Sequence, residues 1–172
     1  MTGITHDLGK LSIPDGILEK PGRLTAEEFA VIRQHTYYTY YTYTILRESD
    51  VPAPLPEWAA YHHERLDGNG YPFHLDAPNL DTGSRIMAVA DVFSALCEDR
   101  PYRPRMGKSQ VEGVMRDMVV GSALDGEIVG ILFDVYEAAE QVMAAEEAVD
   151  DTGSAGCCRG QSGMPAATKD TL

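Results

Sequence analysis

The sequence is poor in cysteine, in basic residues and in long apolar runs. Its 3 cysteines in 172 residues are too few for a disulfide framework, so a reducing, cytoplasmic location is expected. Lys and Arg total 14 against 27 Asp and Glu, a net charge of −13, which argues against binding of DNA, RNA or a membrane surface. No stretch approaches the roughly 18–20 uncharged apolar residues of a membrane-spanning helix, and the N-terminus lacks the segments of a signal peptide.

The apolar residues that are present follow helical spacing, and no alternating run indicates a sheet. Capping patterns begin at Thr25, Ser109 and Asp125, and the stretch 85–96 is apolar nearly all the way round, as in a core helix. The fold class predicted is all-α, with one domain over residues 1–148 and a disordered tail over residues 149–172. Predicted helices run from 26 toward 47, from 56 to about 65, over 85–96, from 109 through 119, and from 126 to about 143.

A repeat of tyrosine and threonine occupies residues 37–44, inside the helix predicted from residue 26. Tyr and Thr are mediocre helix formers, so two interpretations stay open. The stretch is either a helix packed through its aromatic rings, which is favoured, or a small in-frame expansion that strains the local packing.

Four of the five histidines lie near acids or other histidines. His6 precedes Asp7, His62 and His63 precede Glu64, His35 lies in a predicted helix, and Asp91 interrupts the apolar stretch 85–96. Imidazole and carboxylate together suit Fe, Mn or Zn, and an ionised carboxylate in a core is costly unless it is paired or bound to a metal. Each residue alone has a simpler explanation: a packed His35, an Asp91 on a narrow solvent face, or a cationic helix end at His62 and His63.

The chain resembles the HD-GYP family of the HD phosphohydrolase superfamily. The motifs that carry the resemblance are His6-Asp7-Leu8-Gly9-Lys10 and the stretch 62–72, which reads HHERLDGNGYP. The connecting segments 20–25, 85–91 and 99–103 are also similar, and the resemblance spans roughly residues 4–143.

The resemblance implies an all-helical bundle with a centre of two or three ions, iron or manganese, that hydrolyses cyclic di-GMP to pGpG and GMP. Asp7 would bridge two ions and act in catalysis, and Lys10 would contact the scissile phosphate or orient the attacking water. Cyclic di-GMP would be bound by Gly70, Tyr71, Pro72, Arg100 and Arg103. The metal ligands it implies are His6, Asp7, His35, His62, His63 and Asp91.

The residues alone leave simpler roles open for these substrate contacts. Arg100 and Arg103 could form a solvated helix end, Tyr71 could pack on its own turn, and Lys10 could cap a helix. Against this, four of the fourteen basic residues lie within positions 100–108, and such clustering in an acidic chain suits a small phosphate ligand.

The sequence departs from the family pattern at its N-terminus. The superfamily places a further histidine upstream of the His-Asp pair, and residues 1–5 contain no His, Asp or Glu. The bundle is therefore expected to lack its first helices, to expose an apolar patch, to hold metal weakly, and to turn over cyclic di-GMP slowly or not at all. The alternative is a silent module that binds cyclic di-GMP or a signalling protein, or pairs as a homodimer; hydrolysis of another nucleotide is a third option.

Overall fold

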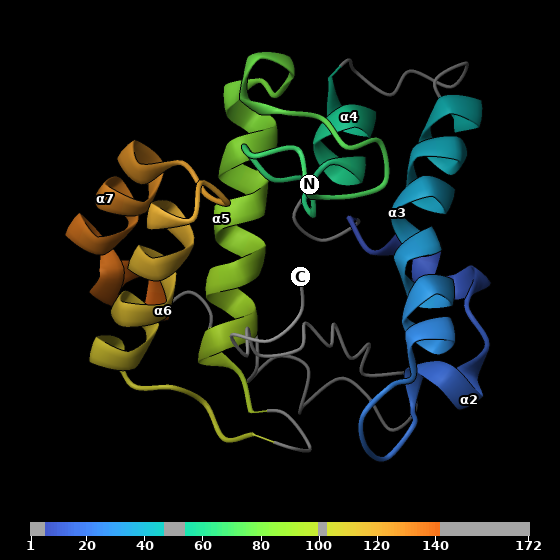
Figure 1. Cartoon of the computed structure of the whole chain (residues 1–172), viewed down its shortest axis with the longest axis horizontal. Helices are drawn as coiled ribbons and strands as arrows, with labels where there is room; N and C mark the ends of the chain where they lie inside the picture. The colour runs from blue at the N-terminus through green and yellow to red at the C-terminus, as the bar shows by residue number, and fades with distance from the viewer. Residues whose placement is uncertain (1–5, 47–53, 100–102, 142–172) are drawn as a thin grey trace.

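The computed structural model describes residues 6–46, 54–99 and 103–141, and these residues are helical or irregular, with no strand among them. One isolated bridge joins Asp67 to Asp76. The predicted all-α class is confirmed for this part of the chain (Figure 1). In chain order the elements are η1 (Leu8–Ser12), α2 (Asp15–Leu18), α3 (Ala26–Leu46), α4 (Leu55–Ala60), η3 (Ala77–Asn79), α5 (Thr82–Cys97), α6 (Lys108–Val120) and α7 (Gly126–Asp134).

Helix α5 lies between two groups of elements. It contacts α6 and α7 on one side and α4 on the other, while α3 packs against η1, α2 and α4 (Figure 1). The hydrophobic core lies between α5, α6 and α7, where Val89, Phe93, Met115 and Val129 are buried together. This burial fixes the axis of α5, so the opposite face of the helix is held at a defined position against α4.

Helix α3 continues through the tyrosine–threonine repeat without a break. Its start is the predicted capping box, in which the Thr25 Oγ1 accepts from the Glu28 N–H and a Glu28 carboxylate oxygen accepts from the Thr25 N–H. Thr36 and Thr39 are fully buried, whereas Tyr37 and Tyr41 are exposed. Residues 37–44 are therefore helical, and the buried face of this stretch is formed by its threonines and not by the rings of Tyr37 and Tyr41.

Three element boundaries differ from the sequence prediction. Helix α7 ends at Asp134 and not near residue 143, because Val135 departs from helical backbone angles (φ −112°, ψ 17°) and caps the helix. Helix α4 ends at Ala60, not near residue 65, because the chain turns at Tyr61 and the Leu66 N–H then donates to the Ala123 carbonyl of a distant loop. Helix α6 is capped by Gly107 together with Gln110, so the box predicted at Ser109 does not form. The Asp125 cap of α7 does form, and its carboxylate accepts from the Glu127 and Ile128 N–H groups.

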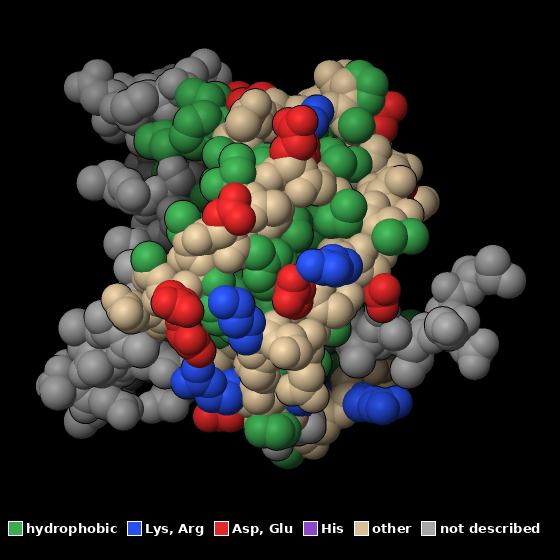
Figure 2. All heavy atoms as spheres, turned by 90° about the vertical axis from the view of Figure 1, so that its left-hand side faces the viewer, with side chains coloured by type: hydrophobic (Ala, Val, Ile, Leu, Met, Phe, Trp, Pro, Cys, Tyr) green, Lys and Arg blue, Asp and Glu red, His purple; other side chains and the backbone are tan. Residues whose placement is uncertain are grey.

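The face formed by α6 and α7 carries exposed apolar side chains. Val120, Ile131 and Val135 are among the most exposed large hydrophobic residues, and Figure 2 shows hydrophobic side chains spread over this face. Among the described residues, no helix is both long and apolar enough to span a bilayer. The disordered tail predicted over residues 149–172 lies outside the described residues.

Candidate metal centre

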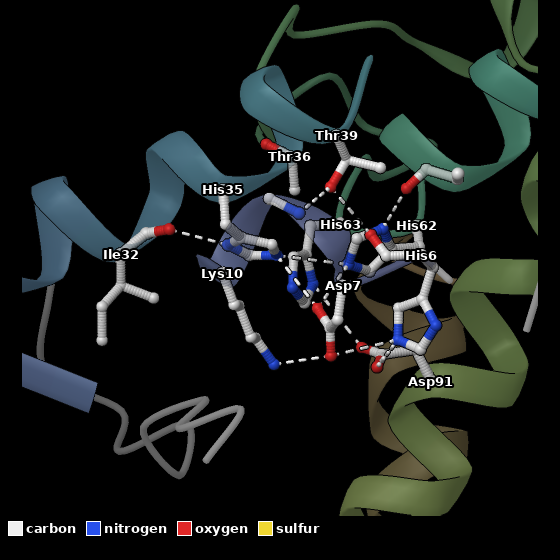
Figure 3. A network of polar contacts seen from close by, with 12 residues as sticks. His6, Asp7, Lys10, Ile32, His35, Thr36, Thr39, His62, His63 and Asp91 are labelled. Carbon is white, nitrogen blue, oxygen red and sulfur yellow. Dashed lines mark hydrogen bonds and ion pairs between the residues drawn. The ribbon is translucent and has the colours of Figure 1, made fainter. Parts of the chain in front are cut away.

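Four separate segments bring together the six residues proposed as metal ligands (Figure 3). His6 and Asp7 precede η1, His35 lies in α3, His62 and His63 follow the end of α4, and Asp91 lies in α5. The ring of His35 lies 5.5 Å from that of His62 and 5.3 Å from that of His63. Only 8 % of the Asp91 side chain is exposed, so it faces the cluster and not solvent.

The turn that carries His6 and Asp7 is fixed to α3 by one buried threonine. The Thr39 Oγ1 accepts from the Gly9 N–H at 2.9 Å and donates to the His6 carbonyl at 3.1 Å. Gly9 is required for this approach, because a Cβ at that position would lie 1.9 Å from the His35 carbonyl oxygen. The contact between η1 and α3 therefore determines where Asp7 points.

Backbone carbonyls fix the orientation of two histidine rings. The Nδ1 of His35 donates to the Ile32 carbonyl at 2.6 Å, and the Nδ1 of His62 donates to the Ala59 carbonyl at 2.6 Å. Since a carbonyl can only accept, each neutral ring carries its proton on Nδ1 and presents a lone pair on Nε2. This is the arrangement in which histidine binds a metal through Nε2.

The two carboxylates lie between the histidines. One oxygen of Asp7 lies 3.4 Å from the His35 Nε2 and 3.9 Å from the His62 Nε2, and the other lies 3.4 Å from the His6 Nε2. Asp91 reaches the His6 Nε2 at 3.5 Å with one oxygen and the His63 Nδ1 at 3.6 Å with the other. Each carboxylate thus faces two or more imidazoles.

Burial keeps these imidazoles neutral. It lowers the pKa of His35 to about 4 and holds the pKa of His62 and His63 below the usual range, in each case against the opposing charges of nearby carboxylates. Burial raises the pKa of Asp91, but the hydrogen bond from His6 and the electrostatic effect of the neighbouring His63 and His62 rings outweigh it, so the net shift is downward. The cluster therefore combines neutral nitrogen ligands with ionised oxygen ligands.

The donor set of the cluster fits a cation. The Nε2 atoms of His35 and His62 face each other at 3.4 Å, although both carry lone pairs when the rings are neutral. Two buried polar atoms, Asp7 Oδ1 and His63 Nδ1, have no hydrogen-bond partner in the described structure. Two groups could each hold an ion: His35, His62 and His63, and His6, Asp7 and His62.

Lys10 contributes the single positive charge that contacts the cluster directly among the described residues. Its Nζ donates to the Asp7 Oδ2 at 2.6 Å, and the side chain is buried. Burial raises the pKa of Asp7, while the charge of Lys10 is the main opposing effect, and the net pKa is lowered. Lys10 therefore keeps Asp7 ionised and lies at the edge of the centre.

The loop over residues 70–72 packs against His63. The Tyr71 ring lies 4.9 Å from the His63 ring, and burial, followed by the charge of Asp91, raises the pKa of its hydroxyl. Gly70 permits this approach, since a Cβ there would lie 2.4 Å from the Glu64 Cα. Glu64 is buried and its carboxylate accepts from the Phe73 and Leu75 N–H groups at 2.6 and 3.1 Å. This loop is therefore tied to the turn that carries His62 and His63.

Of the two predicted arginines, the structure describes only Arg103, and it does not bring this residue to the centre. Arg100 lies outside the described residues. Arg103 donates to the carbonyls of Ala95, Leu96 and Pro104, so its guanidinium holds the C-terminal end of α5. Its role in phosphate binding remains a prediction.

Three residues at the centre were not singled out from the sequence. Thr39 orients the His-Asp turn, Glu64 holds the Tyr71 loop, and the Arg33 guanidinium lies 4.4 Å over the Tyr71 ring. Glu64 follows the two histidines directly and could have been suspected from that position. Thr39 and Arg33 carry no sequence signal, because their partners lie about 30 residues or more away along the chain.

Comparison with known proteins identifies the family. Residues 1–128 match the HD domain, whose members are metal-dependent, and the chain belongs to this family, in its HD-GYP branch. It is 40 % identical over 146 residues, 85 % of its length, to a 3'3'-cGAMP-specific phosphodiesterase of Vibrio cholerae. It is 39 % identical over 116 residues, 67 % of its length, to a cyclic di-GMP phosphodiesterase of Pseudomonas aeruginosa. A cyclic di-GMP phosphodiesterase of Thermotoga maritima is 46 % identical over 100 residues, 57 % of this chain.

The chain spans only part of each of these relatives. The matched segments cover 33 %, 27 % and 26 % of the Vibrio, Pseudomonas and Thermotoga proteins.

Proposed function

We propose that this chain is a metal-dependent phosphodiesterase that hydrolyses cyclic di-GMP to pGpG or GMP. The observation that carries the proposal is the pair of buried imidazole lone pairs, His35 Nε2 and His62 Nε2, that face each other beside the Asp7 carboxylate. The metal is proposed to be iron or manganese, for which mixed imidazole and carboxylate ligands are suited. The ligands proposed are His6, Asp7, His35, His62, His63 and Asp91.

The metal ions, when bound, would lower the pKa of a bound water and polarise the scissile phosphate. Within the chain, Asp7 orients toward three imidazoles and Asp91 toward two, and together they fix the spacing of the centre. The Lys10 ammonium lies against Asp7, where it can donate to a phosphoryl oxygen as negative charge develops there. Tyr71 closes the side of the centre at His63 and keeps bulk water from that side.

The substrate contacts proposed are Gly70, Tyr71, Pro72, Arg100 and Arg103. Support is strongest for the loop residues, because Tyr71 lies directly against a proposed metal ligand. Arginine suits phosphate oxygens through its two parallel donors. For Arg103 to contact substrate, its bonds to the α5 carbonyls would have to be exchanged for phosphate oxygens.

The test is anaerobic purification with metal analysis, then incubation with cyclic di-GMP and chromatography of the products. The His62→Ala, His63→Ala double variant should lose bound metal and product together. His74→Asn is a matched control, because His74 is the histidine outside the cluster and its backbone φ of 56° is tolerated by asparagine. Equal product from the parent and the double variant would remove the centre from the mechanism.

The similarity to the Vibrio enzyme makes 3'3'-cGAMP a second candidate substrate. Both dinucleotides should be supplied at equal concentration, and the ratio of kcat/KM values decides between them. Binding without any product, measured by equilibrium dialysis with metal present, would instead identify a silent module.

A further inference from the structure

Next to the metal centre, two residues of α3 contact two residues of the loop after Gly70. Arg33 and Tyr37 lie one turn apart on the helix, and Tyr71 and Phe73 lie two residues apart on the loop. The Arg33 guanidinium is 4.4 Å from the Tyr71 ring, and the Tyr37 ring is 6.4 Å from the Phe73 ring. Tyr71 contacts His63, so the pair of Arg33 and Tyr71 is the inner one. The pair of Tyr37 and Phe73 lies farther from the metal centre and is the outer one.

The outer pair, Tyr37 and Phe73, is exposed yet fixed in place. Tyr37 is 50 % exposed and Phe73 is 38 % exposed, which is unusual for two large rings that touch. Phe73 is held from behind by the rings of Tyr40 at 5.5 Å and Tyr61 at 5.6 Å, and its N–H is bonded to Glu64. A fixed aromatic surface open to solvent is suited to stacking of a planar ligand, because little conformational entropy is lost on binding.

The inner pair supplies positive charge. Arg33 makes no ion pair with a carboxylate of the described residues, even though the chain has 27 acidic residues. Its guanidinium is held by the face of Tyr71 and keeps its N–H donors for another acceptor. A phosphate oxygen is the acceptor that a guanidinium between a metal centre and an aromatic surface would bind best.

We propose that Tyr37 and Phe73 stack one purine base of the cyclic dinucleotide, and that Arg33 binds the phosphate next to that base. The inference rests on the proposed function and names the residues that contact the base. It also gives the tyrosine–threonine repeat a purpose: Thr36 and Thr39 are buried toward the metal centre, while Tyr37 and Tyr40 build the aromatic surface.

The experiment uses a cyclic dinucleotide in which one guanine is replaced by 2-aminopurine, whose fluorescence is quenched when it stacks on an aromatic ring. The probe is mixed with the full chain and Mn²⁺ in a stopped-flow instrument, and quenching is read before turnover. Phe73→Leu and Tyr37→Leu keep apolar packing and remove the rings. Since stacking of one base is worth about 1–3 kcal/mol, affinity should fall roughly 5- to 150-fold in each variant.

Matched variants separate stacking from folding. Tyr41→Leu removes a ring that is 57 % exposed and lies one turn beyond Tyr37 on α3, so it should leave affinity and quenching unchanged. Phe73→Tyr keeps an aromatic ring and should quench the probe as the parent does. Arg33→Gln should weaken binding of the probe, with quenching still complete at saturation. Metal content per chain, measured for every variant, reports whether the centre has stayed intact.

The outcomes distinguish this inference from the proposed function. Reduced quenching in Phe73→Leu and Tyr37→Leu, with Tyr41→Leu unaffected, supports the stacking surface. Equal quenching in the parent and both variants, or no quenching in the parent, overturns it, whether or not cyclic di-GMP is hydrolysed. Quenching that depends on the two rings, in a parent that forms no product, keeps the base site and rejects the phosphodiesterase activity.

Discussion

At the scale of single residues, Thr39 links the metal-binding turn to α3. Its hydroxyl accepts from the Gly9 N–H and donates to the His6 carbonyl. Replacing a side chain that bonds buried backbone groups removes these bonds at a cost in stability.

Thr39→Val should therefore destabilise the chain by about 1–3 kcal/mol, since valine has the same shape and cannot bond either group. Metal affinity should fall as well, because His6 and Asp7 are no longer held. Urea unfolding and a metal titration measure the two effects. Thr39→Ser keeps the hydroxyl and should retain most of both properties; a serine variant as impaired as the valine variant would show that the methyl group matters instead.

The residues of the candidate site differ in whether the sequence around them predicts their role. Five of the six proposed ligands stand in short motifs, His35 lies in a predicted helix without one, and the structure brings all six into one cluster. Thr39 and Arg33 act on partners about 30 residues or more away, and no local pattern marks them. Arg103 was expected near phosphate, whereas its guanidinium donates to carbonyls at the end of α5, a contact that only the folded chain defines.

At the scale of elements, the packing of η1 on α3 requires glycine at position 9. A Cβ there would lie 1.9 Å from the His35 carbonyl oxygen and 2.7 Å from the Thr39 nitrogen, both backbone atoms that cannot move aside. Gly9→Ala must therefore separate η1 from α3, and with them Asp7 from His35.

The expected cost for Gly9→Ala is about 1–3 kcal/mol or more, from overpacking against backbone. Gly16 in α2 has nothing within 4 Å of an added Cβ, which makes Gly16→Ala the matched control, expected to be neutral or stabilising by up to about 1 kcal/mol. Thermal unfolding of both variants is the measurement. Equal melting temperatures would contradict the close contact between η1 and α3.

Element boundaries were predictable where a local cap decides them. The Thr25 box and the Asp125 cap both form, so the starts of α3 and α7 follow from sequence alone. The end of α4 was not predictable, because the chain leaves the helix to reach the Ala123 carbonyl and the Tyr71 loop. That early end is what places His62 and His63 in a turn facing α3.

At the scale of the whole molecule, the buried imidazoles make stability depend on pH. The pKa of His35 is lowered from 6.5 to about 4 by burial, so the unfolded chain binds more protons than the native chain between these values. Stability of the metal-free chain should therefore be constant above about pH 6.5 and fall as pH decreases toward 4.

His35 alone would contribute about 3 kcal/mol to this loss, and His62 and His63 act in the same direction. The measurement is the free energy of unfolding in urea, with metal removed, at pH values from 7 to about 4.5. His35→Gln cannot titrate, so its stability should change less steeply than that of the parent over this window. Parallel curves for parent and variant would mean that His35 is not buried as a neutral ring.

The spread of the six proposed ligands over residues 6–91 gives a bound cation a mechanical role. A cation held by all four segments would act as a cross-link that closes several chain loops at once, in the way that a disulfide restricts an unfolded chain. The fraction of chains that are folded would then follow the supply of the bound metal. Scarcity of metal would remove the protein through unfolding and degradation, not only through an empty catalytic site.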